Sequence, residues 1–150
     1  MKKILLMAVA FIVSASVMAQ KADDVVKVNT DKYDFGKIKQ GVPVTTYFEL
    51  TNTSNKPVVI ENAWGSCGCT TPEIPKEPIA PKATTKLKVA YNAAAVAPFD
   101  KEVYIKLAGV QEPKIVHITG EVLDAAAYDT YIKNGGKKAE TKKATAKSGK

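Results

Sequence analysis

Two cysteines separated by a single glycine are the residues of this sequence best suited to chemistry. Cys67 and Cys69 lie in the stretch Trp64-Gly-Ser-Cys-Gly-Cys-Thr-Thr-Pro72, which also holds the only tryptophan. On an extended strand, residues two positions apart point to the same face. Gly68 also permits a curled backbone with positive φ, which would bring the two sulfurs together. Four states of the pair are compatible with this spacing.

The first state is a disulfide, acting as a structural link or as a redox couple. A three-residue loop gives such a link only about 1.6 kcal/mol of loop-closure stabilisation, against about 3 kcal/mol for fifteen residues. The second state is a soft-metal site, because two thiolates can chelate Cu(I) or Zn(II). The third is a catalytic or redox-active thiol, and the fourth is a pair of free thiols that pack or form a turn.

The second and third states need further groups. A tetrahedral metal site takes four ligands. The only histidine is His117, on the outward parity of its predicted strand, and every methionine falls within the first 18 residues. A partner or a second copy must therefore complete any Cu or Zn shell at Cys67 and Cys69. A nucleophilic thiol needs a nearby base or positive field, and the spacing differs from the Cys-x-x-Cys of thioredoxin-like proteins.

Three neighbouring residues are candidate binding residues, namely Trp64, Thr70 and Pro72. Trp64 is expected near the end of a strand, where immunoglobulin-type domains bury a tryptophan. Core packing is therefore the favoured interpretation of Trp64, and a ring that faces a ligand is the alternative.

The elements that must position these residues are short strands with alternating apolar and polar side chains. Seven such segments are separated by Gly, Pro and Asn turns, without a long helix between them, at residues 25–28, 33–38, 44–52, 58–64, 84–91, 101–107 and 114–122. This pattern predicts an all-β fold, a seven-stranded antiparallel immunoglobulin-like sandwich over residues 25–123.

Both ends of the chain differ from this body. Lys2 and Lys3, the apolar run 4–13 and small residues up to Ala19 are typical of a signal peptide over 1–19, cleaved after Ala19. We therefore expect a periplasmic or secreted protein without a transmembrane segment in the mature chain. At the other end, Asp124 as N-cap predicts a short helix over 124–134. Residues 135–150 are rich in lysine and lack apolar anchors, so we expect them to be disordered.

The charge distribution narrows the choice of partner. The net charge of +7 comes from the two ends, whereas the body between them is close to neutral. The chain contains no arginine, so bidentate recognition of phosphate or guanine has no residue to perform it. These observations argue against nucleic acid as a partner. The lysine-rich tail either contacts anionic envelope surfaces or serves only solubility.

Several segments together resemble a known family. They are Tyr33-Asp-Phe-Gly-Lys-Ile38, Ser66-Cys-Gly-Cys-Thr-Thr-Pro72, the Pro78-Ile-Ala-Pro-Lys82 turn and Ile118-Thr-Gly-Glu-Val122. They resemble the secreted bacterial family called domain of unknown function 1573, over roughly residues 30–123. That family is similar to the immunoglobulin-like Hydin and major sperm protein domains. The resemblance implies the fold and the compartment but no activity, because fold alone does not confer function.

The sequence therefore favours a non-enzymatic, exported immunoglobulin-like module that binds a protein or a cell-envelope component and needs no cofactor. The reason is the lack of a recognisable set of acid–base or nucleophilic residues. The alternative is a thiol redox or soft-metal protein that uses Cys67 and Cys69.

Overall fold

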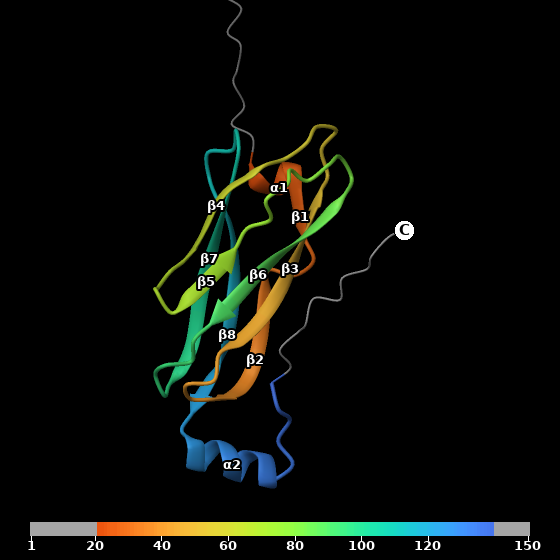
Figure 1. Ribbon diagram of the computed structural model, residues 1–150. Helices are drawn as coiled ribbons and strands as arrows, with labels where there is room; N and C mark the ends of the chain where they lie inside the picture. Colours follow the sequence, from red (N-terminus) through yellow and green to blue (C-terminus); the bar gives the residue numbers. More distant parts are fainter. Residues whose placement is uncertain (1–20, 140–150) are drawn as a thin grey trace, which may run out of the picture.

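Alternating apolar and polar residues build two facing β-sheets, seen in the computed structural model (Figure 1). The structure describes residues 21–139, so the predicted signal peptide over 1–19 and residues 140–150 of the predicted tail over 135–150 lie outside the described residues. No helix within residues 21–139 is long and apolar enough to cross a membrane. The predicted all-β fold with a short C-terminal helix is confirmed in this broad form.

Each sheet has four strands. The first sheet is ordered β1 (Val26–Val28), β3 (Val44–Asn52), β6 (Thr84–Tyr91) and β5 (Thr70–Glu73). The second sheet is ordered β2 (Lys32–Lys39), β8 (Lys114–Leu123), β7 (Pro98–Leu107) and β4 (Ile60–Gly65). β4 and β5 are thus edge strands of different sheets, and a short turn that contains both cysteines joins them.

The core lies between the inner faces of the sheets. Along β3 the side chains alternate between buried and half-buried, with Thr46, Phe48 and Leu50 buried. Phe48 pairs with Leu87 of β6 in the antiparallel register. The alternating apolar residues of the remaining long strands are also buried, namely Val89, Tyr91, Val103, Ile105, Leu107, Val116, Ile118 and Val122. The period-two pattern therefore identified the inner faces of these strands.

Two details of the predicted sandwich are corrected. Residues 21–139 form eight strands rather than the seven predicted, because β5 forms in a proline-containing stretch outside the seven predicted segments. An edge strand tolerates Pro72, since its free side needs no N–H donor. In addition, β2 and β8 pair in parallel within an otherwise antiparallel fold. Parallel neighbours need a long connection, and here the chain from β3 to β7 supplies it.

Helix α2 (Ala125–Lys133) covers one end of the sandwich (Figure 1). Asp124 caps it as predicted, because its side chain accepts a hydrogen bond from the Ala127 N–H at 2.8 Å. Gly135 follows with a φ of 84°, a conformation that favours glycine. Tyr128 is the buried residue of the helix, and Lys39 of β2 pairs with Asp129 at 3.1 Å.

A short N-terminal helix, α1 (Ala22–Val25), lies at the opposite end of the sandwich and was not predicted (Figure 1). Lys114 at the start of β8 contacts it through Asp23, 2.7 Å from the Lys114 Nζ, and the same Nζ lies 2.9 Å from Asp31 in the segment before β2. Partial burial alone would lower the pKa of Lys114, but the two carboxylates outweigh burial, so the pKa lies above its usual value.

Candidate functional site

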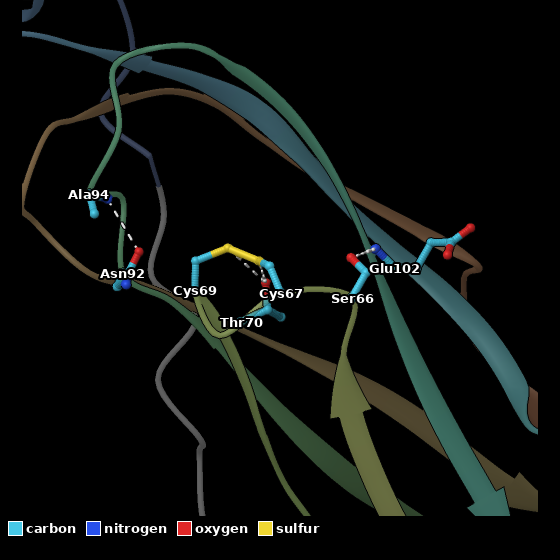
Figure 2. Close-up of a disulfide and its surroundings, with 7 residues drawn as sticks. All are labelled: Ser66, Cys67, Cys69, Thr70, Asn92, Ala94 and Glu102. Carbon is cyan, nitrogen blue, oxygen red and sulfur yellow. Dashed lines mark hydrogen bonds between the residues drawn. A yellow bond between two sulfur atoms is a disulfide. The ribbon is translucent and has the colours of Figure 1, made fainter.

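The turn between β4 and β5 carries the chain from the edge of one sheet to the edge of the other. Cys67 and Cys69 lie in this turn and are joined by a disulfide, with their Cα atoms 5.3 Å apart. Both cysteines are half-buried, and Gly68 between them is exposed. Figure 2 shows the disulfide spanning the turn, with Thr70 beside it. Of the four states compatible with the sequence, this structure contains the disulfide.

Close packing inside the turn sets its shape. The Thr70 N–H donates to the Cys67 carbonyl at 3.2 Å. A Cβ at Gly65 would lie only 2.7 Å from both the Cβ and the carbonyl oxygen of Thr70. Glycine therefore fits position 65 best, because a Cβ there would collide with the Thr70 carbonyl oxygen and Cβ unless the turn shifted.

Thr70 lies beneath the disulfide and is 4% exposed. Its Oγ1 is 3.7 Å from the Cys67 Sγ and 4.0 Å from the Cys69 Sγ, close enough to form weak hydrogen bonds to sulfur. A ligand in solution cannot reach this side chain without rearrangement of the turn. The structure therefore makes Thr70 a support for the disulfide rather than part of an open binding surface.

Hydrogen bonds anchor the turn on both sides, and Figure 2 draws one of them, between Ser66 and Glu102. On the β7 side, the Ser66 N–H donates to the Glu102 carbonyl at 2.8 Å, and the Ser66 Oγ accepts from the Glu102 N–H at 3.2 Å. On the β6 side, the Asn92 N–H donates to the Cys69 carbonyl at 3.0 Å. These bonds do not involve the sulfur atoms, so the turn is held by more than its disulfide.

His117 does not complete a site at the cysteines. It lies on β8, and β7 separates that strand from β4. Its Nδ1 is 2.8 Å from the Asp100 Oδ1, and Lys32 approaches the same carboxylate at 3.3 Å. The hydrogen bond from His117, aided by Lys32, lowers the pKa of Asp100. Among the described residues, no group of three or more His, Cys, Asp or Glu side chains could hold a metal ion.

The interpretation of Trp64 as a core residue is wrong. Its side chain is 40% exposed on the outer face of the second sheet. The physical reason is a register shift between Ile60 and Asn62 in the pairing of β4 with β7. One extra residue reverses the parity of the strand, so Ile60 is buried whereas Trp64 points outward.

Trp64 is part of an aromatic pair that the sequence analysis missed. Its ring stacks on that of Tyr104 of β7, with centroids 5.4 Å apart and planes at 10°. The Tyr104 hydroxyl donates to the Glu102 carboxylate, and this hydrogen bond raises the pKa of the tyrosine. The outward parity of Tyr104, between inward Val103 and Ile105, is the signal that could have revealed it. Trp64 and Tyr104 are called the aromatic pair below.

Pro72, the third candidate binding residue, lies on β5 and so belongs to the other sheet. It is half-buried and pairs with Val89 of β6. The three candidates therefore do not share one surface. Trp64 faces outward from the second sheet, Thr70 is buried at the turn, and Pro72 lies on the edge of the first sheet.

Solved structures with a similar fold come from different organisms and share little sequence identity with this chain. A protein of unknown function from Porphyromonas gingivalis W83 matches with a TM-score of 0.56 and 15% identity, over 65% of this chain and 46% of that one. The ASH/PapD-like domain 7 of human CEP192 matches with a TM-score of 0.54 and 10% identity, over 81% and 99%. The secreted serine protease VesC from Vibrio cholerae matches with a TM-score of 0.53 and 17% identity, over 72% and 25%.

At these identities the likeness shows the fold alone, and this chain spans less than half the length of the first and third proteins. The PapD-like match agrees with the immunoglobulin-like fold expected from the sequence. No curated protein matches the sequence. Residues 26–122 match the family described as "Protein of unknown function (DUF1573)", which the sequence motifs had indicated. The chain belongs to this family.

Proposed function

We propose that this protein is an exported, non-enzymatic immunoglobulin-like module that binds a protein of the cell envelope through the aromatic pair and the free edge of β4. The observation that carries the proposal is the outward Trp64, 40% exposed and stacked on Tyr104. Tryptophan and tyrosine are enriched among the residues that dominate binding energy in protein interfaces. A large ring held rigid on a sheet loses little entropy when a partner covers it.

The position of the aromatic pair supports contact with another polypeptide. β4 is the last strand of its sheet in the part of the chain that the structure describes, so no strand of residues 21–139 continues that sheet beyond Trp64. An edge strand presents backbone donors and acceptors that can form hydrogen bonds with an extended peptide, which then becomes a further strand of the sheet. Pockets beside the strand recognise the side chains of that peptide. Export is part of the proposal and is supported by the N-terminal sequence pattern and by the disulfide, which oxidising compartments permit.

The test begins with capture of partners from the envelope fraction and identification of the bound protein by mass spectrometry. The affinity of the purified partner is then measured for the wild type and for Trp64→Ala. Loss of a dominant interface residue weakens binding by about 30-fold or more. Ile74→Ala, at a residue that is 41% exposed and follows β5, is the matched control and should bind normally. A partner that binds Trp64→Ala as tightly as the wild type would refute the proposal.

The second candidate function is thiol redox or soft-metal chemistry at Cys67 and Cys69. It is favoured by the small loop of a disulfide whose cysteines are both half-buried, because so short a loop adds little to stability. In a redox role, a protein dithiol would break the S–S bond by thiolate attack, leaving two thiols here and a disulfide in the donor. In a metal role, the reduced thiolates would supply two ligands to Cu or Zn. A second copy of the chain or a partner would supply the remaining ligands.

Redox titration against defined dithiothreitol mixtures, read by alkylation of the free thiols, tests this candidate. A redox role predicts reversible conversion within the range of protein dithiols, and a metal role predicts bound Cu or Zn in the reduced protein by elemental analysis. Cys67→Ser/Cys69→Ser is the negative control in both assays. A disulfide that resists reduction in the folded protein would exclude both roles.

A further inference from the structure

A groove at the α2 end of the sandwich remains outside the proposed function. It has a volume of about 520 Å³ and lies between α2 and the turn that joins β2 to β3. Buried Ile38, Val44 and Tyr128 line it. The groove is therefore largely apolar inside, and the segment that follows α2 reaches it at Lys138 and Ala139.

Two apolar side chains on the groove are exposed to solvent. Val42 is 48% exposed in the turn after β2, and Ile132 is 37% exposed on the last turn of α2. Gly41, with a φ of 72°, allows the tight turn that presents Val42. A single exposed apolar residue is ordinary, but two beside one apolar groove form a patch that indicates an interaction surface.

Lysines from the end of α2 and the segment after it lie beside this patch, and Asp129 also lines the groove. Lys133 and Lys138 line the groove and Lys137 is adjacent in sequence; all three are exposed. Among residues 21–139, none of these three forms an ion pair, whereas Lys39 is paired with Asp129. Ala139, the last described residue, also lines the groove. The eleven residues that follow contain four more lysines and one glutamate.

We infer that the α2 end docks on an anionic phospholipid surface, with Val42 and Ile132 entering the interface and the neighbouring lysines contacting the headgroups. Stable peripheral binding commonly needs two signals, an apolar insertion and a polybasic segment, and both meet here. Lysines act as point charges and need no fixed geometry, which suits a diffuse negative surface better than a single carboxylate or phosphate ligand. This inference rests on the export part of the proposed function but not on Trp64.

The experiment is co-sedimentation of the mature full-length chain with vesicles of phosphatidylcholine, with or without 30% phosphatidylglycerol. We expect at least tenfold stronger binding to the anionic vesicles at low salt, with most of it lost in 0.5 M NaCl because surface charges are then screened. Each lysine near an anionic surface contributes about a fivefold gain in binding. Lys133→Gln/Lys137→Gln/Lys138→Gln should therefore weaken binding by well over tenfold.

Matched controls separate this surface from general charge and general hydrophobicity. Lys27→Gln/Lys56→Gln/Lys76→Gln removes three exposed lysines elsewhere and should leave at least half of the binding. Val42→Ser/Ile132→Ser should weaken binding at least fivefold without changing the net charge. Val59→Ser/Ile74→Ser, at residues 43% and 41% exposed, should have little effect.

Equal binding to both vesicle types, or an equal loss for a variant and its matched control, would overturn the inference. So would binding to soluble polyglutamate as tight as that to vesicles and unaffected by Val42→Ser/Ile132→Ser, because that result indicates an acidic protein partner. Trp64→Ala should bind vesicles normally. If the envelope-partner test fails but vesicle binding is intact, only the proposed role of the aromatic pair is rejected, and the inference about the α2 end stands.

Discussion

Removal of the disulfide by Cys67→Ser/Cys69→Ser should cost the fold only a small part of its stability. The chain-entropy relation gives about 1.6 kcal/mol for a loop of three residues. The structure provides no reason for a larger loss, because the backbone bonds of Ser66 and Asn92 anchor the turn independently of sulfur. By comparison, truncation of a buried leucine to alanine costs about 2–5 kcal/mol.

Urea denaturation of the wild type and the variant, followed by circular dichroism, measures this difference. We expect a loss of about 1–2 kcal/mol at an unchanged m-value and a melting temperature lower by roughly 6 °C. The wild type in dithiothreitol should approach the stability of the variant, whereas dithiothreitol should not affect the variant itself. Alkylation and mass spectrometry establish the thiol state of each sample.

A loss above about 3 kcal/mol would refute the reasoning, since that value corresponds to a loop of fifteen residues. It would mean that the disulfide is a principal support of the domain rather than a local feature of one turn. Unchanged stability of the wild type in dithiothreitol, with both thiols demonstrably alkylated, would instead show that the disulfide contributes nothing to the fold.

Three further predictions concern single positions. Gly65→Ala should destabilise the domain by about 1–3 kcal/mol in urea, because its Cβ would lie 2.7 Å from two atoms of Thr70; a neutral effect would show that the turn adjusts freely. Asn52→Ala should cost about 2–3 kcal/mol in the same assay, since the buried amide donates to two backbone carbonyls, those of Lys56 at 2.7 Å and Ile79 at 2.9 Å; a loss below about 0.5 kcal/mol would contradict this role. Because the pKa of Asp100 is lowered in the folded state, its ionised form stabilises the fold. This contribution is fully present above the unfolded pKa of about 3.9 and is lost as pH falls through the lower folded pKa. The stability difference between wild type and Asp100→Asn should thus be present at pH 6 and shrink towards pH 3, and a difference that grows on acidification would contradict the assignment.

The sequence alone was sufficient for the features that depend on local chemistry. The period-two pattern located seven strands within a few residues and identified the buried faces of the long ones, as in Phe48 and Leu50 of β3, but not that of β4. Asp124 and Gly135 marked the ends of α2, because a capping carboxylate and a positive φ are properties of single residues. The cysteine motif also indicated the family, because a short motif can be recognised from the sequence without knowledge of the fold.

Only the tertiary structure decided which segments meet. The parallel pairing of β2 with β8 joins residues far apart in the chain, so no local pattern contains it. The register shift in β4 turned Trp64 outward, because strand parity depends on the pairing partner as well as on the sequence. The groove beside Val42 and Ile132 likewise exists only where α2 packs across the end of the sandwich. Local propensities thus define the elements, whereas the surfaces available to a partner arise from how those elements pack.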